Sequence, residues 1–158
     1  MRHLFYIFYL PLLFQISPVK AEEYTQYCNG RYGFCVDYLT DLGRKPAPDN
    51  GDGVGFYDYG EFIMSVSGSN NVQDETLAEA MQERLADFDQ VSYKKRGKNW
   101  LVLSGYQSSN ILYIKVYLGK GSSNTLYLQY PKSLKKSYDA MVSRASRSFK
   151  AGNLNDSH

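Results

Sequence analysis

The sequence predicts an α+β fold, in which two main helices pack on an antiparallel sheet of about six strands. Segments with alternating apolar and polar residues, typical of strands, occur along most of the chain between Phe34 and Tyr130. Two other segments repeat apolar residues every three or four positions, as amphipathic helices do. Between these two helices, the strand segments follow one another through short polar turns, which is typical of a meander.

Residues 1–21 are interpreted as a secretory signal. Arg2 and His3 form a charged start, an apolar stretch follows, and Val19 and Ala21 place small residues at a cleavage site. The apolar run is too short to span a membrane and is broken by Pro11. We therefore expect a periplasmic or secreted protein that is not an integral membrane protein, with a single α+β domain over residues 22–151 and a flexible polar tail over residues 152–158.

Charge argues against nucleic acid as a partner. The predicted leader contains two of the 18 basic residues and none of the 16 acidic ones, so the remainder carries equal numbers of each sign. Phosphate binding depends on a surplus of Lys and Arg on one surface. The basic run at 94–98 is expected to be a solvated loop, and contact with anionic lipid or peptidoglycan is the weaker alternative.

Cys28 and Cys35 are the only cysteines of the chain. In an oxidising compartment, two cysteines most simply pair with each other, so we expect a disulfide that closes a short loop. The spacing excludes a Cys-x-x-Cys redox centre, and a zinc site would need ligands that the chain lacks.

The first half of the chain is predicted to contain three strands and a helix. Alternation at residues 34–38 indicates a strand, and a loop rich in Pro, Asn, Asp and Gly follows it. Residues 54–59 and 61–67 are predicted as two strands joined at Gly60. A helix comes next, with Asp74 or Glu75 satisfying free amides at its start. Its apolar positions are Leu77, Met81, Leu85 and Phe88.

The second half is predicted as four strands and a closing helix. The strands are 91–95, 100–106, 111–118 and 125–130, and Pro131 ends the last of them. Apolar residues then recur at helical spacing from Leu134 to Phe149.

One strand supplies the candidate binding surface. Along residues 111–118 every second side chain is aliphatic, and the alternate positions are Tyr113, Lys115 and Tyr117. We expect Tyr127 and Gln129 to lie beside them on the next strand. Such a surface of tyrosine and polar groups offers large contact area at low entropic cost. The alternative is that a helix covers this face and that the tyrosines are ordinary packing residues.

Histidine is nearly absent, which bears on catalysis. His3 lies in the predicted leader and His158 ends the tail. Ser-His-Asp and Cys-His catalysis and most zinc and copper sites need imidazole. We therefore expect no catalytic residues, no metal and no cofactor.

Two weaker alternatives use acidic residues of the first half. A carboxylate pair of the kind that a glycosidase needs could be assembled from Asp52, Asp58 and Glu61, although nothing in their spacing demands it. Asn50, Asp52 and Glu61 also fall at the first, third and twelfth positions of a calcium-binding loop, although Val54 at the fifth position does not fit. Acidic residues beside Gly and Asn are usually turn residues, so a plain turn is favoured over both.

Several short signatures occur in order along the chain. They are the segment Tyr32-Gly33-Phe34-Cys35-Val36-Asp37-Tyr38, the central helix, the hairpins after Trp100, and Tyr130-Pro131 before a helix that ends at Ser148-Phe149. In these features the chain resembles the PsbP-like superfamily, which includes periplasmic DcrB-type proteins. The resemblance covers nearly all of the chain after the predicted leader. It implies an accessory or binding role and names no ligand.

The chain is also similar to small secreted proteins of Gram-negative bacteria, some of which are immunity proteins that neutralise toxins. We therefore expect an exported, non-catalytic module that binds a protein partner, either a toxin or an envelope component. In the first case it would be an immunity or inhibitor protein. The alternative is an envelope accessory protein of PsbP or DcrB type, and a carboxylate-based hydrolase ranks third.

Overall fold

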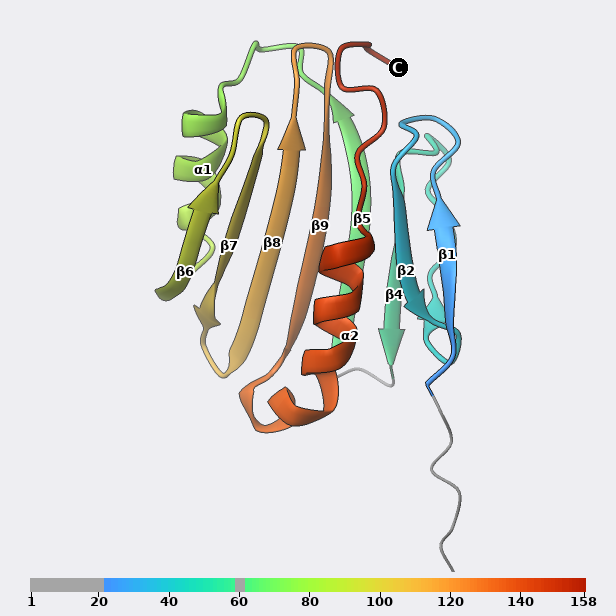
Figure 1. The fold of residues 1–158 in the computed structure, drawn as a ribbon, viewed down its shortest axis with the longest axis vertical. Helices are drawn as coiled ribbons and strands as arrows, with labels where there is room; N and C mark the ends of the chain where they lie inside the picture. The colour runs from blue at the N-terminus through green and yellow to red at the C-terminus, as the bar shows by residue number, and fades with distance from the viewer. Residues whose placement is uncertain (1–21, 59–61) are drawn as a thin grey trace, which may run out of the picture.

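The computed structural model describes residues 22–58 and 62–158, and it confirms the α+β class (Figure 1). The predicted signal at 1–21, Gly60 and Glu61 lie outside the described residues. The elements are β1 (Tyr24–Cys28), β2 (Cys35–Leu39), β3 (Gly43–Arg44), β4 (Gly53–Asp58), β5 (Phe62–Asn70), α1 (Leu77–Leu85), β6 (Gln90–Arg96), β7 (Trp100–Gln107), β8 (Asn110–Leu118), β9 (Ser122–Pro131), the short 3-10 helix η1 (Lys132–Leu134) and α2 (Lys135–Ser148).

The strands form two sheets, and all of their pairings are antiparallel within the described residues. Seven strands lie in the order β3-β4-β5-β9-β8-β7-β6, and β1 and β2 form a separate hairpin. The sequence did not predict β1 or β3. All five residues of β1 are exposed or half-buried without alternation, and β3 has only two residues, so neither has the periodicity that identifies a strand.

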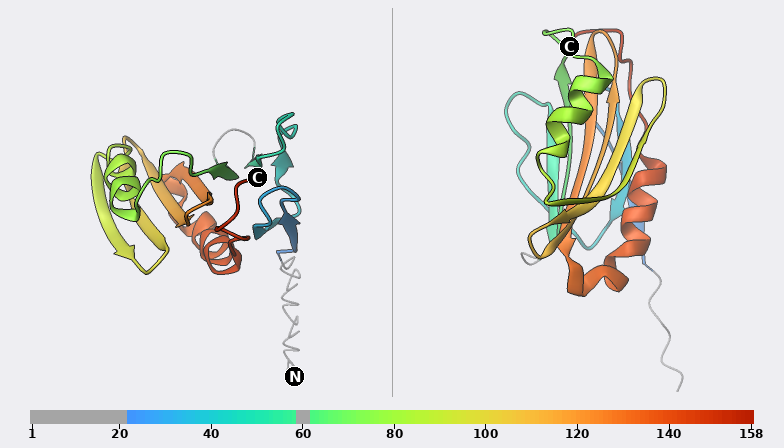
Figure 2. Two further views of the ribbon diagram at one scale, coloured as in Figure 1. Left: turned by 90° about the horizontal axis from the view of Figure 1, so that it is seen from above. Right: turned by 90° about the vertical axis from the view of Figure 1, so that its left-hand side faces the viewer.

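The two helices pack on opposite faces of the seven-stranded sheet (Figure 2). The N-cap of helix α1 lies one residue after Glu75 and two after Asp74, the two residues predicted to cap it. Thr76 is the N-cap, and its hydroxyl accepts a hydrogen bond from the Glu79 amide while the Glu79 carboxylate accepts one from the Thr76 amide at 2.8 Å. This reciprocal capping box satisfies two free amides. Asp74 instead has a positive φ of 53° and belongs to the preceding turn.

The larger hydrophobic cluster lies between α2, the β1–β2 hairpin and one face of the sheet. Its fully buried large side chains are Phe34, Phe56, Phe62, Met64, Leu126, Leu128, Met141 and Phe149. Phe34 directly precedes β2, and the other residues come from the seven-stranded sheet and from α2 or its C-cap, so burial of apolar area joins the three layers.

The smaller cluster lies under α1 on the other face. Buried aliphatic side chains of β7 and β8 form its floor, and Ala80, Met81 and Leu85 pack on them from the helix. Phe88 belongs to the same cluster, although the helix ends before it. The predicted apolar stripe is therefore a packing surface.

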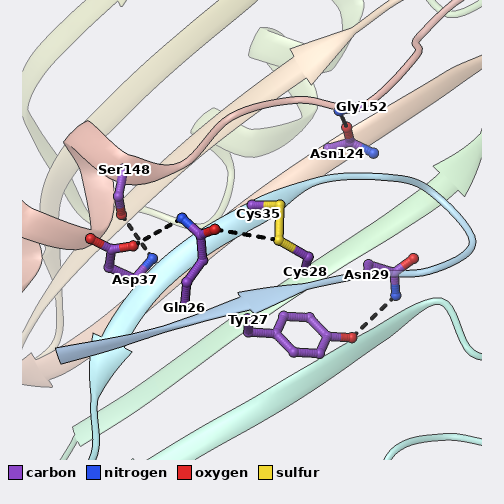
Figure 3. The surroundings of a disulfide bond; sticks show 9 residues. All are labelled: Gln26, Tyr27, Cys28, Asn29, Cys35, Asp37, Asn124, Ser148 and Gly152. Atoms are coloured by element: carbon purple, nitrogen blue, oxygen red, sulfur yellow. Dashed lines mark hydrogen bonds between the residues drawn. A yellow bond between two sulfur atoms is a disulfide. The ribbon is translucent and has the colours of Figure 1, made fainter.

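Cys28 and Cys35 face each other in the β1–β2 register and form a disulfide, with their Cα atoms 4.1 Å apart (Figure 3). The connecting loop is organised by Asn29, which is buried. Its side-chain oxygen accepts hydrogen bonds from the Arg31 and Tyr32 amides at 3.0 and 2.7 Å. The disulfide therefore closes a loop that is also held by an Asn side chain.

Residues 152–158 differ from the expected flexible tail, because they pack along the β8–β9 turn. The Leu154 carbonyl accepts hydrogen bonds from the Gly121 and Ser122 amides at 2.9 and 3.2 Å, and the Leu154 side chain is buried. A Cβ at Gly121 would lie 2.4 Å from the Asn155 carbonyl oxygen. The polar composition indicated a tail, but glycines in the neighbouring turn let its backbone approach.

Candidate binding groove

The structure separates the five predicted surface residues into two groups. Across β8 and β9, Tyr113 is opposite Leu128, whereas Tyr127 is opposite Ile114. Residues directly opposite each other point to the same face, so Tyr127 lies on the α1 face and Tyr113 on the α2 face. Gln129, opposite Leu112, accompanies Tyr127.

The prediction of one shared surface is therefore wrong for Tyr127 and Gln129. The reason is register, because a shift of one residue between two strands moves every side chain to the other face. Tyr127 packs beside the α1 cluster and donates a hydrogen bond to Gln129 at 3.2 Å. Burial, with a smaller contribution from Asp87, raises the pKa of the Tyr127 phenol.

Tyr113, Lys115 and Tyr117 lie on the α2 face, and the end of α2 covers part of each. The hydroxyls of Tyr113 and Ser146 are 2.5 Å apart, and the Lys115 ammonium donates to the Ser146 carbonyl at 2.8 Å. The Tyr117 hydroxyl donates to the Phe149 carbonyl at 3.4 Å. Burial raises the pKa of Tyr113, and the hydrogen bond with Ser146 opposes that shift. The alternative considered from sequence, that a helix covers this face, therefore holds in part, because α2 covers part of these three side chains.

The uncovered part of these side chains opens into a cavity of about 470 Å³, which we call the aromatic groove. It is lined by Tyr93, Lys95, Trp100, Val102, Tyr113, Lys115, Tyr117 and Ser146. Three of these residues come from β8 as predicted, and the β6–β7 hairpin supplies four that the sequence reasoning missed. Alternation along β7 indicated which of its residues share a face, but which β8 residues they adjoin depends on the pairing of the strands.

The floor of the aromatic groove is arranged in cross-strand rows. Adjacent strands place Trp100 beside Tyr117, then Lys95 beside Val102 and Lys115, then Tyr93 beside Ser104 and Tyr113. A basic row therefore lies between two rows that contain aromatic rings. Trp100 can lie against the β6–β7 turn because residue 97 is glycine, where a Cβ would come within 2.2 Å of the indole nitrogen.

The aromatic groove has a positive character. Lys95 and Lys115 contribute two ammonium groups, and no carboxylate lines the cavity. Among the described residues, the ion pairs join Lys135 with Asp139 and Arg144 with Asp37, and neither involves these lysines. The Lys115 ammonium is 5.0 Å from the centroid of the Tyr117 ring. Such a site can hold an anionic group between apolar surfaces.

A second cavity of about 410 Å³, the polar cavity, lies beside the first along α2. Its lining includes Ser104 and Tyr106 of β7, Tyr130 of β9, and Asp139 of α2. Burial and the neighbouring Asp139 carboxylate raise the pKa of Tyr130 to about 12, so this phenol is neutral near neutral pH. Ser104 lines the polar cavity and its cross-strand partner Tyr113 lines the aromatic groove, so the two hollows adjoin.

Two of the carboxylates considered for hydrolysis, Asp52 and Asp58, lie apart. Asp52 directly precedes β4 and Asp58 ends it, so they are separated by about 20 Å at 3.3 Å per residue. A glycosidase pair is at most about 9.5 Å apart. Asp58 accepts hydrogen bonds from the Tyr138 hydroxyl and the Phe62 amide, and Asp52 accepts one from Asn50. These side chains serve local structure, and within the described residues no group of three or more His, Cys, Asp or Glu side chains could hold a metal ion.

No described helix has both the length and the apolar character needed to cross a membrane.

Comparison with known proteins relates this chain to others through its fold. The chain matches no protein-family model. No curated protein matches it either. The solution structure of cyanobacterial PsbP (CyanoP) from Synechocystis sp. PCC 6803 is similar, with a TM-score of 0.60 and 15% sequence identity. The match covers 88% of this chain and 98% of CyanoP, so the protein has a PsbP-like fold.

Proposed function

We propose that this chain is an exported, non-catalytic module that binds a protein partner through the aromatic groove. The observation that carries this proposal is the grouping of four aromatic rings, from Tyr93, Trp100, Tyr113 and Tyr117, around two lysine ammonium groups in an open cavity. Tyrosine and tryptophan are enriched at protein interfaces and dominate their energetics. Half of the Tyr93 surface is exposed, so part of this aromatic area remains available to a partner.

The place of action in this proposal is the periplasm or the cell exterior. The predicted signal at 1–21 and the Cys28–Cys35 disulfide support it, because disulfides persist in oxidising compartments. Within that setting the partner is either a toxin, which the protein would neutralise as an immunity or inhibitor protein, or an envelope component. The PsbP-like fold favours the second candidate, an envelope accessory protein, because the superfamily resembled in sequence consists mostly of accessory and binding proteins.

The test compares two tyrosines on opposite faces of the sheet. Tyr93 and Tyr57 are 50% and 40% exposed, and both lie on strands, but only Tyr93 lines the aromatic groove. Tagged protein comprising residues 22–158 would be used to capture partners from an envelope extract as wild type, Tyr93→Ala and Tyr57→Ala, with quantitative mass spectrometry. We expect one protein, in near-equal amount to the bait, to be retained by wild type and Tyr57→Ala and lost from Tyr93→Ala.

The identity of the captured protein separates the two candidates. A toxin or an envelope enzyme supports inhibition, and a component of a membrane assembly supports the accessory role. Equal capture by all three baits would refute the placement of the binding site in the groove. Catalytic turnover that depends on Asp58 would overturn the non-catalytic proposal altogether.

A further inference from the structure

Building on the proposed function, we infer that the groove receives an extended segment of the partner with an acidic side chain at one position and apolar side chains two residues before and after it. The segment would lie on the exposed face of β6, β7 and β8, beside α2.

The spacing of the groove floor carries the pattern. Successive rows along β7 are set by Trp100, Val102 and Ser104, which are two residues apart on one strand. A strand rises about 3.3 Å per residue, so the rows follow one another every 6.6 Å or so. An extended peptide presents side chains to one side at that same interval. A ligand chain that runs along β7 therefore meets each row with every second residue.

The middle row selects an acidic side chain. Lys95 and Lys115 flank Val102 on neighbouring strands, so their backbones are about 10 Å apart at 4.8 Å per strand. Val102 is 8% exposed, which leaves a low apolar floor between two long basic side chains. Both lysines can reach one carboxylate placed above Val102. The hydrogen bond from Lys115 to the Ser146 carbonyl uses one of its three protons and leaves the other two for a ligand.

The outer rows select apolar side chains. On one side, Trp100 and Tyr117 are cross-strand neighbours, and on the other Tyr93 and Tyr113 lie on the two strands that flank Ser104. The hydroxyls of Tyr113 and Tyr117 form hydrogen bonds with Ser146 of α2 and with the carbonyl of its C-cap Phe149, so their rings can present mainly apolar surface. Large aromatic surfaces gain most from contact with apolar or aromatic partners. The resulting pattern is apolar, any residue, acidic, any residue, apolar.

The three rows of the aromatic groove set the length of the segment. From Trp100 to Ser104 they extend over about 13 Å at 3.3 Å per residue. Cavities of about 410 and 470 Å³ are in the size range of ordinary ligand pockets. They can admit a chain segment and not a folded element. About five extended residues span this distance, which matches the length of the pattern.

A peptide titration tests the inference without knowledge of the partner. The probe is acetyl-Ser-Leu-Ser-Glu-Ser-Phe-Ser-amide, added to residues 22–158 labelled with nitrogen-15 and followed by amide chemical shifts. We expect shifts at groove residues. Replacing Glu by Gln in the peptide should raise the Kd by about three- to tenfold, which is the range for a partly exposed charge-assisted contact. Raising the salt concentration should also weaken binding of the Glu peptide, because salt screens the attraction between its carboxylate and the lysines.

The neighbouring lysines of β6 provide a matched pair of variants. Lys95 belongs to the groove floor, whereas Lys94 pairs with Leu103 and points to the opposite face. Both are exposed, and K95Q and K94Q change net charge equally. We expect K95Q to weaken binding of the Glu peptide about as much as the Glu-to-Gln change does, and K94Q to leave it unchanged.

The outcomes distinguish this inference from the proposed function. Equal effects of K94Q and K95Q, or no shifts at millimolar peptide, would overturn the acidic-segment inference, even if Tyr93→Ala still abolished capture of a partner. If the peptide binds as expected but Tyr93→Ala does not change capture of the partner, the groove recognises such segments and the partner binds elsewhere on the protein.

Discussion

On each face of the seven-stranded sheet, the strands near one edge are covered and the strands near the other edge are open. The open strands lie near opposite edges on the two faces. On the α2 face, α2 and the β1–β2 hairpin cover β4, β5 and β9, whereas β6, β7 and β8 remain partly open as the aromatic groove. On the α1 face, the helix covers β7 and β8, and β4 and β5 are open.

The two open regions differ in their side chains. The α2 side presents aromatic rings and lysines, while the α1 side presents mainly small residues, including Gly55, Ser65 and Ser67, with Tyr57 and Ile63 as its exposed large side chains. Small polar residues offer little area to bury and leave few groups for a partner. Openness alone therefore does not identify a site, whereas the chemistry of the open surface does.

The largest expected effect comes from comparing how much each covered region contributes to the free energy of unfolding. Phe149 is 1% exposed and packs against Phe34 and Tyr117 in the α2-side cluster, whereas Met81 of α1 is only half-buried. We expect Phe149→Ala to lower the free energy of unfolding by about 3 to 5 kcal/mol and Met81→Ala by about 1 kcal/mol. Urea denaturation of the oxidised protein measures both. Equal losses would show that the two clusters contribute alike.

An intermediate effect is expected from the disulfide, which constrains the hairpin that covers the α2 face. Replacing Cys28 and Cys35 together by Ser should lower the free energy of unfolding by about 2 to 3 kcal/mol, because the sequence separation of 7 closes a short loop in the unfolded chain. The comparison is urea denaturation of the variant and of wild type under non-reducing conditions. The hairpin lies away from β6, so peptide binding by the folded variant should persist. Loss of that binding at low urea would show that the covered and open ends of this face depend on each other.

The smallest effect concerns the α1 side. Thr76→Ala removes the hydroxyl of the capping box and should cost about 1 kcal/mol. The amide and hydroxyl of Thr76 also hold the pKa of the Glu79 carboxyl below its usual value. Hydrogen exchange should accelerate in α1 and leave α2 unaffected. Accelerated exchange at Ser146 or Phe149 would contradict the independence of the two faces.

Much of the architecture could be predicted because it depends on local periodicity. Alternation along β8 and β9 identified these strands, and the apolar repeats identified α1 and α2 to within a few residues. Elements without periodicity were missed, as the short β3 shows. The position of residues 152–158 also could not be predicted, because it depends on Gly119 and Gly121, which lie in a turn far earlier in the chain.

The candidate site was predictable only in part, for a related reason. Tyr113, Lys115 and Tyr117 share a face because they alternate on one strand, and no pairing information is needed to see it. Their neighbours depend on how strands pair. The sequence reasoning chose Tyr127 and Gln129, whereas the register brings Trp100, Val102 and Lys95 to that face.

By itself, the sequence determined the fold class, the two amphipathic helices and which residues of each strand alternate, because these follow from periods of about two and 3.6 residues within short segments. Tertiary structure alone decided which of those faces meet. Register across β6, β7 and β8 assembled the basic row between aromatic rows, and the docking of α2 decided how much of it stays open. A surface shared by several elements requires their relative placement, which long-range packing sets.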